Sequence, residues 1–299
     1  MKVLITGGSG LLGSALTKKL LKEKIDVAHL TRTKSSKHNV KNFEWDWRKN
    51  KIDHRALKGV THVVHLAGAG IAEKAWTSKR KQTIVKSRVL TARLIYNTII
   101  KKNLKIETFI SASGTGYYGA ILNNKTYLES DSHKNDFLGN CCYQWENAAD
   151  RFKDNCRVVK LRLGVILDQN EGALPKISAL IKKGLGAPIG TGKQYMPWIH
   201  LDDAVEIFYS SIINEKYNGT YNAVASEHVN NANLTYAIAD VLNKKIRLPN
   251  VPNIILKFLY GELSETITKG VKVSNEKIKN EGFKFQYDNL NEALAEIYN

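Results

Sequence analysis

The chain has 299 residues, of which 24% are charged, and a formal net charge of +17 at pH 7. This length is enough to bury a sizeable core, and no apolar stretch approaches the roughly 20 residues that span a bilayer. The lysines are scattered, without an arginine-rich stripe, so the charge favours small anions over specific nucleic-acid binding. Cys141, Cys142 and Cys156 have neither metal-ligand spacing nor an even disulfide framework. We therefore expect a reduced, soluble, cytoplasmic protein with no metal site and no membrane contact.

The first half of the sequence alternates short apolar runs with helical patterns. Apolar runs separated by helices are typical of a parallel sheet that is covered on both faces. We expect strands at 2–6, 26–30, 62–67, 106–112 and 157–163, and helices at 11–23, 77–102 and 140–154.

The pattern loosens after residue 165, where helices are expected near 173–183, from about 203, and at 290–298. The sequence thus predicts an α/β Rossmann fold, in which a doubly wound parallel sheet at 1–165 binds a nucleotide. A smaller C-terminal α/β substrate lobe at 166–299 would follow, with some elements returning to the first domain. The glycine-rich loop from Gly184 to Trp198 is expected to close one wall of the cleft, with a rigid structural loop as the alternative.

The first strand runs into a glycine-rich turn, Thr6-Gly7-Gly8-Ser9-Gly10-Leu11-Leu12-Gly13. Gly7 permits a tight turn, Gly10 lets the backbone approach a pyrophosphate, and Gly13 lets the helix lie close to the sheet. The helix expected at 11–23 would point the free N–H groups of its first turn, which contains Leu11 and Leu12, at phosphates. The alternative is an ordinary strand-to-helix turn, but strand, turn and helix in this order favour a dinucleotide site.

The end of the second strand indicates which dinucleotide is preferred. An NAD site usually has a carboxylate about 20 residues beyond the glycine turn, whereas this chain has Thr31, Arg32 and Lys34 and no acid. Arg32 could stack on adenine and hold a 2′-phosphate, with Thr31, Ser35 and Ser36 as hydroxyl donors. The alternative is a solvated loop arginine. The pattern favours NADP(H).

Several later stretches resemble a known family: HLAGAGIAEKAWTSKRKQ, SASGTGYYG, LRLGVIL, GLGAPIGTG and PWIHLDDA. The chain resembles the extended short-chain dehydrogenase/reductase superfamily, and within it an epimerase-like branch often labelled cell-division-inhibitor homologues. The resemblance covers nearly the whole chain and implies a Rossmann domain, a C-terminal substrate lobe and bound NADP(H). It also implies cofactor contacts from Thr31, Arg32, Leu66, Ala67, Gly68, Thr83, Arg88 and Ile166.

The catalytic residues of that superfamily are not where the resemblance would place them. The wider superfamily uses a serine and a Tyr-x-x-x-Lys pair, in which the lysine lowers the pKa of the tyrosine. Here Cys142 falls at the tyrosine position, Glu146 at the lysine position and Gly114 at the serine position. A glutamate there would raise the pKa of a nearby phenol. The usual catalytic set is therefore absent.

Candidate replacements for the missing acid–base group are Tyr117, Cys142, Glu146 and His200. Each has a structural alternative: Cys142 as a buried core residue, His200 as a helix cap, and Tyr117 as a packing residue. Two functions stay open. One is an NADP(H)-dependent oxidoreductase or epimerase of unassigned small-molecule substrate; the other is a non-enzymatic NADP(H)-binding sensor or interaction protein.

Overall fold

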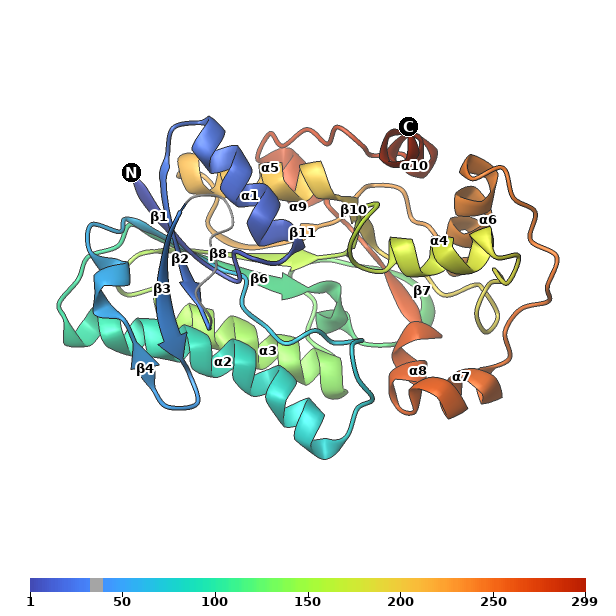
Figure 1. The fold of residues 1–299 in the computed structure, drawn as a ribbon, viewed down its shortest axis with the longest axis horizontal. Helices are drawn as coiled ribbons and strands as arrows, with labels where there is room; N and C mark the ends of the chain where they lie inside the picture. The colour runs from blue at the N-terminus through green and yellow to red at the C-terminus, as the bar shows by residue number, and fades with distance from the viewer. Residues whose placement is uncertain (33–39) are drawn as a thin grey trace.

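A sheet of eight strands forms the centre of the computed structural model, which describes residues 1–32 and 40–299 (Figure 1). The strand order is β11-β8-β6-β5-β1-β2-β3-β4, and neighbouring strands are parallel except for β3 and β4. The order reverses between β5 and β1, which confirms the doubly wound Rossmann arrangement. The strands are β1 (Lys2–Thr6), β2 (Asp26–Thr31), β3 (Lys41–Asp46), β4 (Lys51–Ile52), β5 (His62–His65), β6 (Thr108–Gly114), β8 (Arg157–Leu163) and β11 (Gly219–Ala223).

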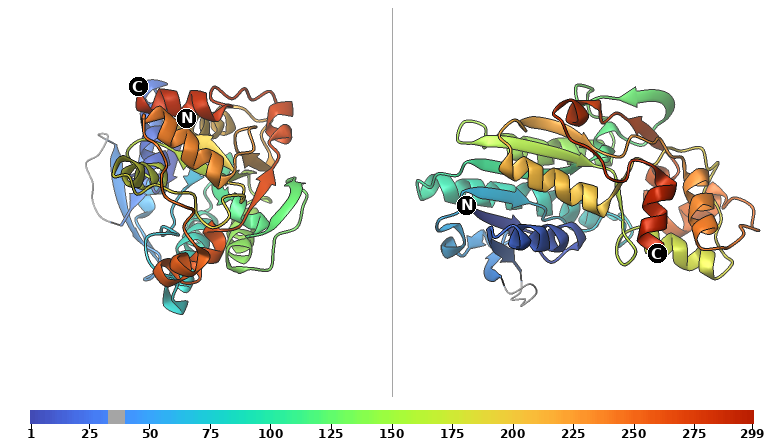
Figure 2. Two further views of the ribbon diagram at one scale, coloured as in Figure 1. Left: turned by 90° about the vertical axis from the view of Figure 1, so that its right-hand side faces the viewer. Right: turned by 90° about the horizontal axis from the view of Figure 1, so that it is seen from above.

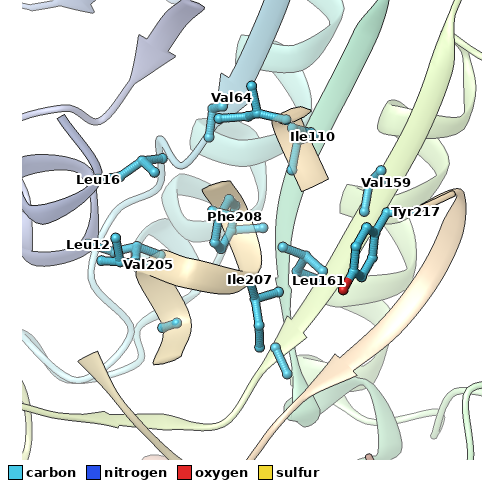
Figure 3. Close-up of a cluster of buried hydrophobic side chains, with 14 of the residues drawn as sticks. Leu12, Leu16, Val64, Ile110, Val159, Leu161, Val205, Ile207, Phe208 and Tyr217 are labelled. Atoms are coloured by element: carbon cyan, nitrogen blue, oxygen red, sulfur yellow. The ribbon is translucent and has the colours of Figure 1, made fainter. Parts of the chain in front are cut away.

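Helices cover both faces of this sheet (Figures 1 and 2). One face carries α1 (Leu11–Lys22) and α5 (Leu201–Ile213), and the other carries α2 (Ser78–Lys101) and α3 (Phe137–Asp150). Successive strand residues point to opposite faces, so Val159 packs in the α1/α5 core of Figure 3 and the preceding valine packs in the α2/α3 core. Burial on both faces explains why these strands are continuous apolar runs.

The remaining elements lie mostly beyond one end of the sheet (Figure 2). Trp198 and helices α4, α6 and α10 share a separate apolar core. The described residues contain no helix long and apolar enough to cross a membrane. The elements outside the main sheet and its four covering helices are η2 (His54–Leu57), η3 (Thr115–Tyr118), β7 (Leu122–Tyr127), β9 (Val165–Leu167), α4 (Leu174–Lys182), β10 (Trp198–His200), α6 (Asn231–Val241), α7 (Asn253–Tyr260), α8 (Leu263–Ile267), β12 (Gly270–Val273), α9 (Glu276–Asn280) and α10 (Leu290–Tyr298).

Most of the expected elements agree with the structure to within a few residues. The expected helix at 140–154 instead begins at Phe137, because the carboxylate of Asp136 accepts the backbone N–H of Gly139 at 2.8 Å and caps it. Strands β3, β4 and β11 were not expected from the sequence. Helix α5 and strand β11 follow residue 165, yet they pack on or within the main sheet.

The loop from Gly184 to Trp198 is tied to the rest of the C-terminal lobe by hydrogen bonds. The amide of Gln194 donates to the carbonyl of Ile267 at 3.2 Å outside the loop and to that of Ile189 at 3.0 Å within it, and the N–H of Met196 donates to the carbonyl of Val229 at 2.8 Å. Both Gln194 and Trp198 are buried within the lobe. This arrangement favours the rigid-loop alternative over a mobile wall of the cleft.

Candidate functional site

The glycine turn after β1 has a geometry that only glycine accommodates at two positions. Gly7 has a φ of +74°, which side chains disfavour, and its carbonyl accepts the N–H of Gly10 at 3.1 Å. A methyl group at Gly13 would lie 2.3 Å from the Gly7 oxygen. Helix α1 has no side-chain cap, so the N–H groups of its first turn, at Leu11, Leu12 and Gly13, have no helical partner and can bind an anion.

A cleft of about 540 Å³ lies at the carboxyl ends of β1, β2 and β5, beside the point where the strand order reverses. Ligands bind at this place in doubly wound sheets. The hydroxyl of Thr6 joins β1 to the loop after β5, because it accepts the N–H groups of Leu66 and Ala67 at 3.2 and 3.1 Å. The expected cofactor residues that line the cleft are Gly7, Gly10, Thr31, Arg32, Leu66, Ala67, Gly68 and Thr83.

One end of the cleft, where β2 and β3 finish, carries polar groups without partners. The hydroxyl oxygen of Thr31 is buried and has no hydrogen-bond partner within residues 1–32 and 40–299. Arg32 is exposed and forms no ion pair with any described residue. The expected donors Ser35 and Ser36 lie outside the described residues. This end is called the adenosine end below.

Two residues at the adenosine end were missed from the sequence. Trp47 and Arg48 line the same cleft from the turn between β3 and β4. Their position depends on β3, whose residues are only partly buried. The alternation of Phe43 and Trp45 with polar residues was the signal that could have revealed this strand.

Three other expected cofactor residues place their side chains away from the cleft lining. Leu12 belongs to the α1/α5 core, Leu11 borders another surface cavity, and Ile166 pairs with Ile199 between β9 and β10. Leu11 and Leu12 can therefore contribute backbone N–H groups only.

Arg88 lies behind the loop that follows β5. Its guanidinium donates to the carbonyls of Ala69 and Ile84 at 3.0 and 2.9 Å, and a methyl group on Gly68 would lie 2.8 Å from its Cζ. The guanidinium also lies 4.9 Å from the ring centroid of Trp145. Burial lowers the pKa of Arg88. In this arrangement Arg88 supports the loop that lines the cleft.

The ring of Trp145 also fixes the protonation of a buried histidine. Its indole N–H donates to Nδ1 of His65 at 3.2 Å, so Nε2 of His65 carries the proton and donates to the hydroxyl of Thr91 at 2.9 Å. Burial lowers the pKa of His65 to about 3, with the charge of Arg88 as a smaller cause. His65 is therefore neutral at pH 7 and its two nitrogens are both bonded.

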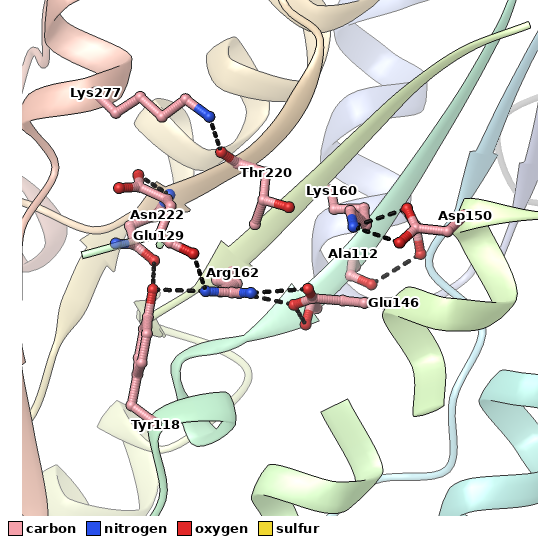
Figure 4. Close-up of polar contacts among 12 residues, drawn as sticks. Ala112, Tyr118, Glu129, Glu146, Asp150, Lys160, Arg162, Thr220, Asn222 and Lys277 are labelled. Carbon is pink, nitrogen blue, oxygen red and sulfur yellow. Dashed lines mark hydrogen bonds and ion pairs between the residues drawn. The ribbon is translucent and has the colours of Figure 1, made fainter. Parts of the chain in front are cut away.

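Glu146, next to Trp145 on α3, forms a buried ion pair (Figure 4). Its carboxylate accepts two hydrogen bonds from Arg162, at 2.8 and 2.9 Å, and one from the hydroxyl of Ser113 at 2.8 Å. Burial opposes the charge of Arg162, but Glu146 outweighs it and raises the pKa of the guanidinium above its usual value. Each carboxylate oxygen of Glu146 thus accepts from Arg162, so Glu146 is not a free base in this structure.

The other acid–base candidates surround this pair. Arg162 also donates to the hydroxyl of Tyr118 at 2.8 Å, and its Cζ lies 3.4 Å from the ring centroid of Tyr117. Tyr117 is half-buried, and burial raises the pKa of its phenol. Cys142 is buried, and burial raises the pKa of its thiol to about 12. Tyr117 is therefore the most accessible hydroxyl of this group, which is called the catalytic end below.

His200, the fourth candidate, caps the next helix. Its Nδ1 accepts the N–H of Asp202 at 3.2 Å at the start of α5, and its Nε2 lies 2.9 Å from the carboxylate of Glu296. The alternative reading as a helix cap is confirmed.

Comparisons with known proteins give a consistent family. The model of the NAD dependent epimerase/dehydratase family matches residues 3–223, and a domain of unknown function matches residues 251–297. The chain is 31% identical over 295 residues to an epimerase family protein of Staphylococcus aureus (strain MRSA252), covering 98% of each chain.

Solved structures share the fold over the whole chain. The human epimerase family protein SDR39U1, solved with NADPH, is 27% identical with a TM-score of 0.90, covering 100% of this chain and 99% of that one. A UDP-glucose 4-epimerase from Thermus thermophilus, solved with NAD, has a TM-score of 0.78 at 17% identity, with 100% and 99% covered, and shows the fold alone. The extended short-chain dehydrogenase/reductase fold expected from the sequence is thus confirmed, and the chain belongs to the NAD dependent epimerase/dehydratase family.

Proposed function

We propose that the chain binds NADP(H) in the cleft beside the glycine turn and is an epimerase-like oxidoreductase of unassigned substrate. The observation that carries the proposal is the unpartnered polar surface at the adenosine end, where Thr31 and Arg32 face the cleft. The similar human protein, solved with NADPH, supports this cofactor.

The residues of the cleft fit a dinucleotide part by part. The pyrophosphate would lie against Gly10 and the free N–H groups of α1, and Arg32 would hold the 2′-phosphate by a charge-assisted contact. Thr31 would gain the hydrogen-bond partner that its buried oxygen lacks. The bound cofactor would supply hydride transfer at its nicotinamide ring.

The chain's own residues offer little proton transfer beside that ring. Reduction of a carbonyl needs a proton at the developing alkoxide, and a positioned acid typically contributes about 10²–10⁴-fold. Burial raises the pKa of the Cys142 thiol to about 12, and Glu146 is held by Arg162. Tyr117 has the most accessible hydroxyl, but it is not among the residues that line the cleft and burial raises the pKa of its phenol. We therefore expect slow turnover of ordinary short-chain substrates.

A second function, a non-enzymatic NADP(H)-binding sensor or interaction protein, is favoured by the same ion pair. A scaffold that fills its acid–base positions with a buried Glu146–Arg162 pair keeps cofactor binding without proton transfer. The two functions differ in one property: an enzyme oxidises bound NADPH when a carbonyl substrate is present, whereas a sensor only binds it.

Calorimetric titration of the protein with NADPH and with NADH tests the proposal. A charge-assisted contact is worth about 1.5–3 kcal/mol, so NADPH should bind at least about tenfold more tightly than NADH, and Arg32→Ala should remove that preference. Equal dissociation constants for the two cofactors would contradict the proposal.

A further inference from the structure

We infer that Arg48 is a second residue that determines cofactor specificity, and that it holds the 2′-phosphate of NADP(H) together with Arg32. This inference rests on the proposed function and adds a residue that neither the glycine turn nor the end of β2 points to. Arg48 comes from a different strand end, in the turn between β3 and β4.

The fold brings the two arginines to one cleft. Strands β2 and β3 are parallel neighbours, with Thr31 opposite Glu44, so the residues that follow them emerge at the same edge of the sheet. Arg32 follows β2 directly and Arg48 follows β3 by two residues. Both line the 540 Å³ cleft that contains the glycine turn.

Neither arginine has an acidic partner within the described parts of the chain, whereas Arg80, which lines the same cleft, is paired with Glu73. Arg55, Arg80 and Arg162 each form an ion pair with a nearby carboxylate. The carboxylate nearest to Arg48 in the sequence, Asp46, accepts the backbone N–H of Arg48 at 2.9 Å and so shapes the turn. The guanidinium charge of Arg48 therefore remains available to an anion.

An aromatic ring supports Arg48 without neutralising it. Its Cζ lies 4.6 Å from the ring centroid of Trp47, a cation–π contact that restrains the side chain. A phosphate monoester carries about −1.5 to −2 charges at pH 7, more than one arginine neutralises. Two guanidinium groups, each able to form paired hydrogen bonds, suit that charge better than one.

The neighbouring residue provides a matched control. Lys49 is exposed, carries the same charge and belongs to the same turn, but it lines a neighbouring cavity of about 710 Å³, which shares Arg32 with the cleft of the glycine turn, and does not line that cleft itself. Replacing either residue by alanine changes the net charge equally. A difference between the two variants therefore reports position and not overall electrostatics.

The test is calorimetric titration of wild type, Arg48→Ala and Lys49→Ala with NADPH, NADH and 2′,5′-ADP at one fixed salt concentration. We expect Arg48→Ala to raise the dissociation constants of NADPH and 2′,5′-ADP by about tenfold or more. The dissociation constant of NADH should change by less than about twofold. Lys49→Ala should change the dissociation constants of all three ligands by less than about threefold, as expected for an exposed, screened charge that does not line the cleft. Circular dichroism confirms that each variant is folded.

The outcomes separate this inference from the proposed function. If wild type prefers NADPH but Arg48→Ala binds it unchanged, the role of Arg48 is overturned and the proposed function stands. If Arg48→Ala weakens NADPH and NADH equally, Arg48 contacts another part of the cofactor and the inference is again overturned. If wild type shows no preference, both fail. A non-additive effect of Arg32→Ala and Arg48→Ala would support one shared phosphate.

Discussion

The adenosine end of the cleft and the catalytic end, whose residues are not among those that line the cleft, differ in how their polar groups are used. At the adenosine end, Thr31 has a buried hydroxyl without a partner and Arg32 and Arg48 have no carboxylate partner among the described residues. At the catalytic end, Glu146 is fully paired with Arg162 and both nitrogens of His65 are bonded. Groups that stabilise a fold are paired within it, whereas groups that bind a ligand are left with bonding capacity. The polar groups of the adenosine end are thus free to bind a ligand, whereas those of the catalytic end are bonded within the fold.

The adjacent residues Trp145 and Glu146 show how the side chains of α3 are bonded to the sheet. Because they are successive residues on α3, their side chains point about 100° apart. Trp145 reaches His65 on β5, and Glu146 reaches Ser113 on β6 and Arg162 on β8. The two side chains thus attach the helix to three strands. Glu146, which the resemblance would place at the lysine position of the wider superfamily, here carries a carboxylate that anchors α3 to the sheet.

The largest expected effect is on the free energy of unfolding and should come from breaking the buried ion pair between Glu146 and Arg162. Removing one partner of such a pair leaves an uncompensated buried charge and typically costs about 3–5 kcal/mol. We expect Glu146→Ala to lower the free energy of unfolding by about that amount, measured by urea denaturation. The double variant Glu146→Leu with Arg162→Met should recover much of the loss. A change below about 1 kcal/mol in Glu146→Ala would show that the pair is not structural.

A smaller effect should appear in the pH dependence of stability. His65 titrates near pH 6.5 in the unfolded chain and near 3 in the folded protein, so below pH 6.5 the unfolded state binds the extra proton. The neutral state of His65 therefore contributes its full stability above pH 6.5. As the pH falls this contribution is lost, and the free energy of unfolding drops by about 2 kcal/mol at pH 5. Unfolding of wild type and His65→Gln between pH 7 and 5 measures this.

The His65→Gln variant should lack that part of the pH dependence, because glutamine does not titrate. Both proteins share every other titrating group, so the difference between their two curves isolates His65. Curves that stay parallel from pH 7 to 5 would mean that His65 is not held neutral by the fold.

The smallest effect is expected from the thiol of Cys142. It is buried, burial raises its pKa to about 12, and it belongs to the catalytic end and not to the residues that line the cleft. We expect Cys142→Ala to change the dissociation constant of NADPH by less than about twofold, at a cost of about 1 kcal/mol in stability for the lost packing. A large loss of NADPH affinity would place this thiol in the cofactor site.

The sequence located residues that line the cleft more readily than it located the hydrogen-bond partners at the catalytic end, for a physical reason. Gly7, Gly10 and Gly13 and the adjacent Arg32 belong to local strand, turn and helix patterns that are visible along the chain. Arg48 was missed because the strand that positions it is partly exposed and has a weak apolar pattern. Its location also depends on the pairing of β3 with β2, which is not a local property.

The partner of Glu146 could not be predicted for a similar reason. Ser113 and Arg162 are directly opposite each other on β6 and β8, so they meet the carboxylate of Glu146 only once these strands are paired. The sequence placed Glu146 correctly on a helix but gave no information about that register. Burial of the adjacent Cys142 likewise follows from how α3 packs on the sheet.

The measurement that tests the central claim most directly is NADPH oxidation by the wild type, with a panel of sugar nucleotides, steroids and aldehydes, at saturating cofactor. Typical enzymes turn over at about 10 s⁻¹, and the loss of a positioned acid costs about 10²–10⁴-fold. We therefore predict tight NADPH binding with turnover below about 0.1 s⁻¹. Turnover near 10 s⁻¹ that disappears in Tyr117→Phe would contradict the account and identify that phenol as the working acid.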